Sequence, residues 1–298
     1  MLEQISSEIM FHEPLIRKLK RVTLGAAWAL RPDRAVGLPT LGYHLAREIV
    51  SPSKQLPDPQ LALHQPRGFC GIARDLSPER LAAAYRRGMY PFAHIAPLKW
   101  WSPPERCILS FRDFHISKRL RSRLRQSRHH VTFDRNFAEV MKACAEPREG
   151  KWQLTWITPT IMRAFQELHN AGYAHSFEVW NGNNDLIGGG YGVAVGGSFA
   201  IESQFTREAH SSKIGFAVLN WHLARWGFVL NDNKLPTRNT LEMGFRVVPR
   251  ADYLDRLKDA ALLPDRGRSW SVETDLANVA AWLPNASSVP SAEAIANR

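Results

Sequence analysis

The sequence predicts an α+β fold arranged in about two domains, and three observations carry that prediction. The chain has 298 residues, 44% of them hydrophobic, which is enough for a sizeable core. Helix-like apolar spacing and strand-like alternation occur in separate segments. Glycine- and asparagine-rich turns divide those segments. No stretch approaches the ~20 consecutive apolar residues that cross a bilayer, and no secretory signal is evident, so we expect a soluble chain.

Two helices are predicted from the residues at their ends. Ser77 is typical of an N-cap and Pro78 of a first helical position, and Gly88 ends this helix. Thr158-Pro159 begins a second helix, which ends near Gly172. The apolar residues of the second helix share one face: Ile161, Met162, Phe165 and Leu168.

A strand meander and a third helix follow. Alternation predicts three strands, over residues 176–180, 186–195 and 198–206. Asn181–Asp185 and Gly196-Gly197 form the turns between them. Ser211-Ser212 is expected to cap a helix that Gly227 ends, and 228–230 is predicted as a buried strand. Helix, antiparallel meander, helix and strand in this order are seen in acyltransferases of the N-acetyltransferase-like type.

The composition indicates a polyanionic partner. Lys and Arg number 39 against 28 Asp and Glu, which gives a formal charge of +11. Nucleic acid is the first candidate and an anionic membrane surface the second, with an ordinary basic enzyme as the alternative. The three cysteines form no C-x-x-C pair, so we expect reduced thiols in a cytoplasmic protein.

Residues 1–66 are predicted as a basic extension that ends in a linker. Cations precede the apolar run 22–30, which favours an amphipathic helix on a partner or membrane, or equally a structural helix or a partly ordered arm. Those cations are Arg17, Lys18, Lys20 and Arg21. Four prolines mark the linker: Pro52, Pro57, Pro59 and Pro66. The last residues, 285–298, resemble a loose tail.

The most distinctive charge feature is a cluster of cations over residues 118–128, which contain no acidic residue. Its members are Lys118, Arg119, Arg121, Arg123, Arg125 and Arg128. Leu120 and Leu124 lie four residues apart, which predicts one apolar stripe under a basic helix surface. A solvated charged face is one interpretation. We favour phosphate contact, because like charges at helical spacing repel unless a polyanion compensates them. No DNA-reading motif accompanies the cluster, so DNA is not expected as a partner.

Metal and nucleoside-triphosphate motifs are not found, and no metal site is expected. His169 and His175 are interpreted as structural residues. Gly188-Gly189-Gly190 precedes a strand rather than a helix, so its amides cannot form the usual phosphate cradle. Aromatic residues are frequent, notably Trp100-Trp101 and Trp156, and they are either core residues or platforms for an unpaired RNA end.

From Gly68 to Leu254, about three-fifths of the chain, the sequence resembles the leucyl/phenylalanyl-tRNA–protein transferases, which move an amino acid from tRNA to a protein N-terminus. The resemblance rests on collinear motifs, among them Ala84-Tyr85-Arg86-Arg87-Gly88-Met89-Tyr90-Pro91, Trp100-Trp101-Ser102-Pro103, Thr155-Trp156-Ile157-Thr158, Ala174-His175-Ser176, Glu178-Val179-Trp180, Gly188-Gly189, Tyr191-Gly192-Val193 and Glu202-Ser203. It implies an N-acetyltransferase-like catalytic domain behind a smaller N-terminal α+β domain.

The resemblance also implies boundaries and a site. We expect the small domain over 67–132, the catalytic domain over 133–265 and a tail over 266–298. Asp232 would accept or orient a proton, Glu202 would hold the donor's α-amino group or ribose, and Lys234 would complete the catalytic set. The donor and its 3′ adenosine would contact Tyr85, Phe92, Trp101, Trp156, Phe199, Ser203, Gln204 and Phe216. The cationic cluster would follow the tRNA stem.

Departures from the family pattern concentrate in this site. Phe92 replaces a tryptophan, Gly190 replaces a large apolar residue, and Asp232-Asn233-Lys234 replaces Asp-Cys-Gln. The family's Gly-Glu-Ser-Met-Phe-Ser appears here as residues 201–206, Ile-Glu-Ser-Gln-Phe-Thr. A lysine beside Asp232 favours the carboxylate and repels a cationic acceptor. We therefore expect an acceptor other than the family's Lys or Arg N-terminus: an acidic or neutral N-terminus, a peptide or a small amine.

The expected activity is amide-bond formation between a tRNA-borne, Leu- or Phe-like amino acid and an amine. Aminoacyl-tRNA is itself the activated donor, so no separate cofactor is expected. Two other functions fit the same residues. One is a tRNA- or RNA-binding descendant without activity. The other is an acyltransferase using a lipid or acyl-CoA, with membrane contact through the extension; the stretch 207–213, which lacks a glycine-rich pyrophosphate turn, argues against acyl-CoA.

Overall fold

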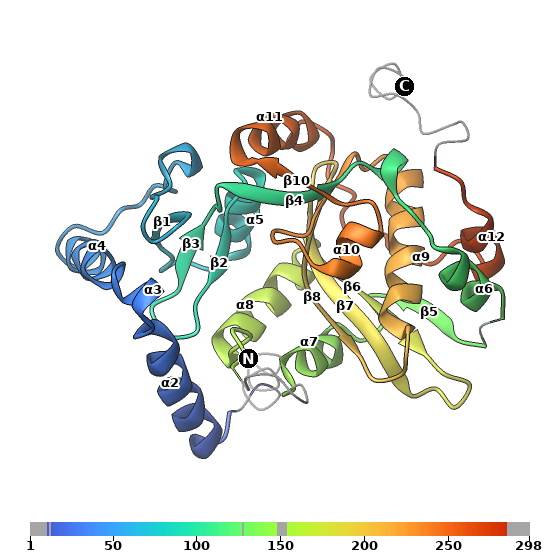
Figure 1. Cartoon of the computed structure of the whole chain (residues 1–298), viewed down its shortest axis with the longest axis horizontal. Helices are drawn as coiled ribbons and strands as arrows, with labels where there is room; N and C mark the ends of the chain where they lie inside the picture. The colour runs from blue at the N-terminus through green and yellow to red at the C-terminus, as the bar shows by residue number, and fades with distance from the viewer. Residues whose placement is uncertain (1–10, 12, 127, 148–153, 285–298) are drawn as a thin grey trace. The chain divides into compact units, whose positions relative to one another are not determined.

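The computed structural model describes residues 11, 13–126, 128–147 and 154–284. The chain divides into two compact units (Figure 1). One contains residues 1–104 and 145–168, and the other contains residues 105–144 and 169–298. Among the described residues, no helix combines the length and the apolarity that crossing a membrane requires.

The first unit joins helices to a small antiparallel sheet in the order β1-β3-β2. Its helices are α2 (Leu15–Ala29), α3 (Pro32–Ala35), α4 (Leu38–Val50), α5 (Pro78–Arg86) and most of α8 (Pro159–Asn170), with a 3-10 turn at Pro59–Leu61. Its strands are β1 (Phe69–Ile72), β2 (Tyr90–Phe92) and β3 (Lys99–Trp101). Ser77 caps α5 as expected, because its hydroxyl accepts the N–H of Arg80, with Pro78 at the first position.

Residues 13–66 of the extension form a structural part of the first unit, which is one of the alternatives that their sequence allows. In α2, Leu15 and Ile16 are exposed, but Gly25 is buried. A Cβ on Gly25 would approach Cγ1 of Ile95 to 2.6 Å, so the helix packs closely here because residue 25 has no side chain. A glycine therefore allows the extension to pack against the segment that follows β2.

The second unit is built on a seven-stranded sheet with the order β10-β4-β9-β8-β7-β6-β5. Its strands are β4 (Glu105–Leu109), β5 (His130–Phe133), β6 (Ala174–Trp180), β7 (Leu186–Val195), β8 (Ser198–Thr206), β9 (Leu230–Asp232) and β10 (Arg246–Pro249). Its helices are α6 (Lys118–Gln126), α7 (Phe137–Ala145), α9 (Ser211–Arg225), α10 (Arg238–Glu242), α11 (Arg250–Ala261) and α12 (Leu276–Ala281), with a 3-10 turn at Phe111–Asp113. Neighbouring strands are antiparallel except for the parallel pair β8–β9, which α9 connects.

Among the described helices, α9 and α11 pack on this sheet, and side chains alternate along the strands between the α9 face and the α11 face (Figure 1). α9 packs against β6, β7 and β8, and α11 packs against β4, β8, β9 and β10. In β4, Cys107 and Leu109 enter the α9 core, whereas Ile108 joins Tyr253 of α11. Arg106 shares the face of Ile108, because side chains two residues apart point the same way. The same alternation places Asp232 on the face of Leu230, toward α11.

The structure corrects the predicted boundaries. The basic helix α6 belongs to the second unit, with β4 and β5, instead of a small domain over 67–132. Residues 266–284 are not a tail. Trp270 is buried and stacks on His175 with ring centroids 3.9 Å apart, and Val279 of α12 lies in the core. A large aromatic side chain removed from water stabilises that segment far more than its polar composition suggests. The tail predicted over 285–298 lies outside the described residues.

Two local predictions near α9 also need correction. His210, with a left-handed φ of 72°, precedes the helix and makes no side-chain cap. Ser211 instead lies inside the first turn, and its hydroxyl donates to the carbonyls of Ile187 and Glu208 at 2.8 Å. The strand predicted over 228–230 is β9, which spans Leu230–Asp232 instead. The predicted meander and its turns at 181–185 and 196–197 are confirmed.

Candidate active site

Asp232 lies at the end of β9, and its carboxylate is completely buried. Arg106 of β4 donates from Nε to Oδ1 at 3.1 Å and from Nη2 to Oδ2. Tyr253 of α11 donates its hydroxyl to Oδ2 at 3.1 Å, and the backbone N–H of Lys234 donates to Oδ1 at 2.8 Å. Both carboxylate oxygens therefore accept at least two hydrogen bonds.

These donors determine the charge of Asp232. Burial by itself raises the pKa of this carboxyl group, but the Arg106 guanidinium outweighs it, and Lys234 adds to the effect. The net result is a pKa below the ordinary aspartate value. Asp232 is thus a fixed anion and a weak base, which agrees with the expectation that Lys234 favours the carboxylate form.

Lys234 forms a second ion pair beside the first. Its Nζ lies 2.5 Å from Oε1 of Glu202 and 2.6 Å from the carbonyl oxygen of Ile201, both on β8. The side chains are 10% and 1% exposed, respectively, for Lys234 and Glu202. The three predicted catalytic residues, Asp232, Glu202 and Lys234, therefore lie together, as two neighbouring pairs of opposite charge.

The backbone at Lys234 is unusual. Its φ is 59°, in the left-handed region that L residues with a side chain rarely adopt. Its carbonyl accepts the N–H of Cys107, and the N–H of Asn233 donates to the carbonyl of Cys107, so β4 holds this turn on both sides. Strain of this kind is concentrated at functional sites, which supports a functional reading of residue 234.

Sequence reasoning did not identify a third buried carboxylate, Glu178 of β6. It is fully buried and accepts hydroxyl groups of Thr132 at 2.6 Å and Ser176 at 2.5 Å. The backbone N–H groups of Arg135 and Asn136 also point to it, at 3.4 Å. Burial raises its pKa against these hydrogen bonds. An acid between Phe177 and Val179 in a buried strand was the available signal.

The donor-binding residues predicted from the sequence are divided between the units. In the first unit, Phe92 and Trp156 pack with ring centroids 5.7 Å apart, and the indole N–H of Trp101 donates to the carbonyl of Phe92 at 2.9 Å. These three side chains are half-buried, whereas Tyr85 is buried in α5. Phe92, Trp101 and Trp156 therefore form one aromatic group.

In the second unit, Phe199 and Phe216 are core residues with 1% and 2% exposure. Ser203 and Gln204 are half-buried on β8, where Gln204 pairs with Gly190 of β7. A Cβ at Gly190 would lie 2.7 Å from Cγ of Gln204. The side chain of Gln204 thus occupies the space next to residue 190, which explains how the chain accommodates glycine at that position.

The predicted basic helix is confirmed as α6, with Leu120 and Leu124 buried beneath it. Its exposed cations form a surface that we call the α6 surface, made of Lys118, Arg119, Arg123, Arg125 and the adjacent Arg128. Arg121 differs, because its guanidinium donates to the carbonyls of Ile116 and Ala280 and holds α6 in place. Burial lowers the pKa of His210, and Arg119 and Arg123 lower it further, so the α6 surface lies near the start of α9.

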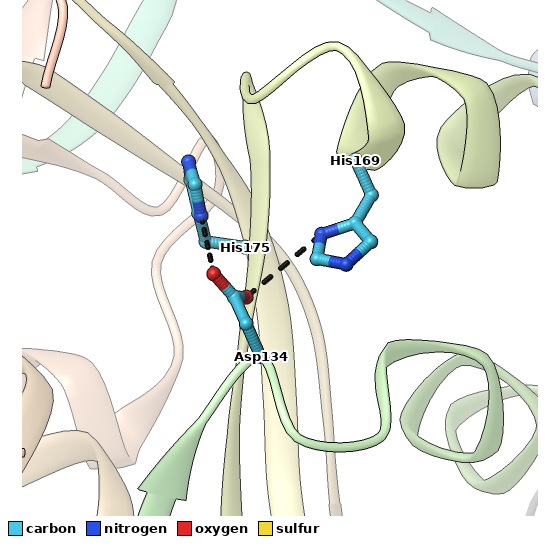
Figure 2. A group of neighbouring side chains, drawn as sticks. All are labelled: Asp134, His169 and His175. Carbon is cyan, nitrogen blue, oxygen red and sulfur yellow. Dashed lines mark hydrogen bonds and ion pairs between the residues drawn. The ribbon is translucent and has the colours of Figure 1, made fainter. Parts of the chain in front are cut away.

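One group among the described residues could hold a metal ion: Asp134, His169 and His175 (Figure 2). Both ring nitrogens of His175 and Nδ1 of His169 already have protein partners. Nδ1 of His175 lies 2.7 Å from Oδ2 of Asp134, and Nδ1 of His169 lies 3.9 Å from Oδ1 of the same carboxylate (Figure 2). Nε2 of His175 lies 3.1 Å from the carbonyl oxygen of Gly172, and Nδ1 of His169 bonds to the carbonyl of Ala174 at 2.8 Å. A metal would displace these hydrogen bonds. We interpret the group as a network that fixes the connection between α8 and β6.

His94 gives the first unit an acid-sensitive element. Burial lowers its pKa to about 4, and Arg34 and Lys99 add to the shift against a hydrogen bond with the backbone of Thr155. The folded chain therefore holds His94 neutral. Its contribution to stability is present above the unfolded pKa of about 6.5 and is lost as the pH falls toward 4, because the unfolded state binds a proton that the folded state does not.

We accordingly expect His94→Gln to make the unfolding free energy less dependent on pH in the acidic range. Between pH 6.5 and pH 4.5, the decrease in unfolding free energy should be smaller in this variant by up to about 1.4 kcal/mol per pH unit. Urea titrations at several pH values measure that slope for both proteins. Identical slopes would contradict the assignment.

Buried ionisable groups with displaced pKa values are characteristic of enzymes, and an exposed arginine-rich helix suits a phosphate-bearing substrate. The second unit thus has the features of an enzyme that acts on a nucleic acid or a nucleic acid conjugate. The chain belongs to the leucyl/phenylalanyl-tRNA protein transferase family. The family model with that description matches residues 108–258, and the model for the family's N-terminal domain matches residues 74–104.

The sequence of this chain is similar to curated relatives over nearly their whole length. The leucyl/phenylalanyl-tRNA–protein transferase of Azotobacter vinelandii is 47% identical over 213 residues, which is 71% of this chain and 93% of the relative. That of Pseudomonas syringae pv. syringae is 47% identical over 70% of this chain and 91% of the relative. Among solved structures, FemX matches 49% of this chain and 60% of its own, with a TM-score of 0.38 and 12% identity. Its membership of the family makes this chain an aminoacyltransferase.

Proposed function

We propose that the chain moves an amino acid from an aminoacyl-tRNA to the α-amine of a protein's N-terminal residue. The observation that carries the proposal is the 47% identity to transferases of that name over 93% of their length. We assign leucine- or phenylalanine-like donors on the same ground. The reaction takes place in the cytoplasm, where charged tRNA is present, and it needs no separate cofactor, because the aminoacyl ester is already activated.

The chemistry requires little beyond positioning. The acceptor's nitrogen attacks the ester carbon, the new amide bond forms, and the bond from that carbon to the ribose oxygen breaks. The amine loses one proton and the ribose oxygen gains one. An α-amine with a pKa near ~7.7 is substantially neutral at cellular pH, so its activation needs no strong base. Holding amine and ester together supplies most of the acceleration.

We assign Asp232 a positioning role instead of proton transfer. A carboxylate with a lowered pKa and four donors is a poor base. Its hydrogen bond to the backbone N–H of Lys234 supports the left-handed turn that directs the Lys234 side chain toward β8. Asp232 then sets the position of residue 234 and not the proton balance of the reaction.

The pair of Lys234 and Glu202 is the part of the site that we place against the substrates. The Lys234 ammonium stabilises the oxyanion that develops on the ester carbonyl, and Glu202 receives the proton of the acceptor amine. Because Glu202 neutralises Lys234, the pair carries no net charge. The repulsion of cationic acceptors expected from the sequence is thereby offset, and N-terminal Lys or Arg is an admissible acceptor.

Substrate binding uses the rest of the assigned residues. The α6 surface contacts tRNA phosphates, and the group of Phe92, Trp101 and Trp156 stacks against the terminal adenosine. We further propose an N-acetyltransferase-like fold for the second unit. The parallel pair β8–β9, joined by α9 in an otherwise antiparallel sheet, supports it.

A transfer assay tests the proposal. Purified protein receives tRNA charged with labelled leucine, phenylalanine or other amino acids, together with a model protein that begins with arginine. We expect label from leucyl- or phenylalanyl-tRNA on that protein. The same protein with an acetylated N-terminus is the matched control, since it has no free α-amine. Equal labelling of both forms, or no loss of label from tRNA, would contradict the proposal.

Substituting Lys234 tests the role of the ion pair. In Lys234→Gln the Glu202 carboxylate loses its cation, so we expect the preference for N-terminal Arg over a neutral N-terminus to rise roughly five- to tenfold, about 1–1.4 kcal/mol. Initial transfer rates at pH 8 to acceptors that begin with Arg, Ala or Glu measure the change.

Lys213→Gln is the matched control, because Lys213 is a more exposed lysine whose Nζ lies 4.0 Å from a carboxylate oxygen of Glu242. It removes the same charge from the second unit without touching Glu202. Equal acceptor preferences in the native chain and Lys234→Gln would refute the proposed pairing.

A further inference from the structure

The first unit contains a cavity of about 790 Å³ whose walls come from two parts of the sequence. The extension contributes Trp28 and Arg34, together with apolar residues of α4 such as Leu41 and Leu45. The small sheet and the loop after β2 contribute Phe92, Lys99 and Trp101. The family models begin at residue 74, so the wall formed by the extension lies outside the part of the chain that they match.

The lining combines aromatic rings with cations. The guanidinium carbon of Arg34 lies 3.5 Å from the centre of the Trp28 ring. Trp28 contacts His94 edge-on at 4.7 Å between ring centroids, and His94 contacts Phe92 at 4.9 Å. Rings from the extension are therefore continuous, through His94, with the aromatic group assigned to the terminal adenosine.

The charged residues of the lining favour an anionic ligand. Arg34, Arg67 and Lys99 line the cavity, and Asp33 is the one acid among the described lining residues. The Asp33 side chain is 71% exposed and already faces Arg34 at 3.7 Å. Across residues 11–67, nine Lys and Arg stand against four Asp and Glu. Aromatic and guanidinium platforms beside an excess of positive charge are the features that hold unpaired nucleotides, by base stacking and phosphate contact.

We propose that this cavity binds an unpaired nucleotide, namely the one that precedes the terminal adenosine of the aminoacyl-tRNA. Its base stacks on the Trp28–Arg34 pair, and its phosphate lies near Lys99. The inference rests on the proposed function, which supplies the tRNA end. It adds a subsite built by the extension. The chain then contacts one nucleotide in addition to the adenosine assigned to Phe92, Trp101 and Trp156.

Titrations of the full chain with short ribonucleotides test the subsite without charged tRNA. We expect the 5′-phosphorylated dinucleotide CpA to bind about 5- to 100-fold more tightly than adenosine 5′-monophosphate, the range that one stacked base supplies. Trp28→Ala and Arg34→Gln should each reduce this advantage to threefold or less. Tyr43→Ala and Arg47→Gln are matched controls on α4, because both residues are exposed and neither lines the cavity. They should retain the full advantage.

Two further measurements, a cross-linking experiment and a comparison with free nucleotides, test the same subsite. In the native chain, CpA carrying 5-iodocytidine should cross-link on irradiation to the peptide that contains Trp28, which needs no variant to fold. Cross-links confined to residues beyond 104 would overturn the proposal, as would an undiminished CpA advantage in both variants. Trp28-dependent binding of cytidine 5′-monophosphate or ATP as tight as that of CpA would assign the cavity to free nucleotides and overturn the tRNA source.

Failure of this inference and failure of the proposed function are distinguishable. Amino acid transfer without a CpA advantage removes only the subsite. A Trp28-dependent CpA advantage without any transfer removes only the proposed reaction and leaves a nucleotide site in the first unit.

Discussion

Replacing Arg106 by methionine is expected to lower the free energy of unfolding by about 3–5 kcal/mol, the usual cost of removing one partner of a buried ion pair. Arg106 is 1% exposed and Asp232 is fully buried, so neither water nor another guanidinium can take over. Tyr253 would remain as the one side-chain donor to Asp232 among the contacts described above. Urea denaturation of both proteins at pH 7 measures the loss.

Arg238→Met is the matched control for that experiment. Arg238 also pairs with a carboxylate, Oε1 of Glu242 at 2.9 Å, but its side chain is 92% exposed. A surface pair of this kind contributes about 0–1 kcal/mol. If both variants lost the same stability, or Arg106→Met lost less than about 1 kcal/mol, the buried pair would not support the fold as described. The variant Arg106→Met/Asp232→Leu should recover much of the loss, because no unpaired charge remains buried.

Neutralising the α6 surface is expected to weaken tRNA binding about 100-fold at 0.15 M salt. The variant Arg119→Gln/Arg123→Gln/Arg125→Gln removes three exposed cations from one helix. Each lost phosphate contact flattens the plot of log affinity against log salt by about 0.9, which corresponds to roughly fivefold at this concentration. The slope should therefore become shallower by about 2–3. Binding of uncharged tRNA at four salt concentrations gives both quantities.

The control carries the same change of charge elsewhere on the second unit. Arg246, Arg256 and Lys258 are exposed on β10 and α11, and replacing all three by glutamine leaves α6 intact. We expect its salt slope to stay within about 0.5 of the native value. Equal losses in the two triple variants would mean that net charge, and not the α6 surface, governs binding. Arg121 stays unchanged in both, since it anchors α6 to Ala280.

Elements bounded by helix-capping or turn residues could be predicted from the sequence. Ser77-Pro78, the turn at Asn181–Asp185 and the glycine pair at 196–197 each fix a backbone conformation through their own chemistry, and the structure confirms all three. The buried stripe of Leu120 and Leu124 followed from helical periodicity in the same way. These features depend on neighbours within four residues.

The partners of the site residues could not be predicted in that way. Arg106 and Asp232 are 126 positions apart, and Glu202 and Lys234 are 32 positions apart. Spacing in the sequence carries no information about contacts made through strand pairing. The sequence therefore identified neither Arg106 as the partner of Asp232 nor the pairing of Lys234 with Glu202, and we propose different roles for both carboxylates.

Composition misled the prediction at the C-terminal side. Residues 266–284 contain Ser, Asn and Asp, yet Trp270 and α12 complete the core. One buried tryptophan outweighs several polar neighbours, because burial energy follows apolar area and not residue count. His210 is a similar case, since a left-handed backbone at that residue displaced the cap expected at Ser211.

The position of β4 has a consequence for how the second unit is made. This strand, Glu105–Leu109, pairs with β9 and β10, which lie more than 120 residues later in the chain. During synthesis, β4 leaves the ribosome long before either neighbour exists, and its hydrogen-bonding edges must wait until residue 249 has been added. Loop closure over that distance slows folding. We therefore expect Arg106 and Asp232 to meet late, so that a nascent chain stalled before residue 230 would expose β4 and would resist proteolysis less than the finished protein.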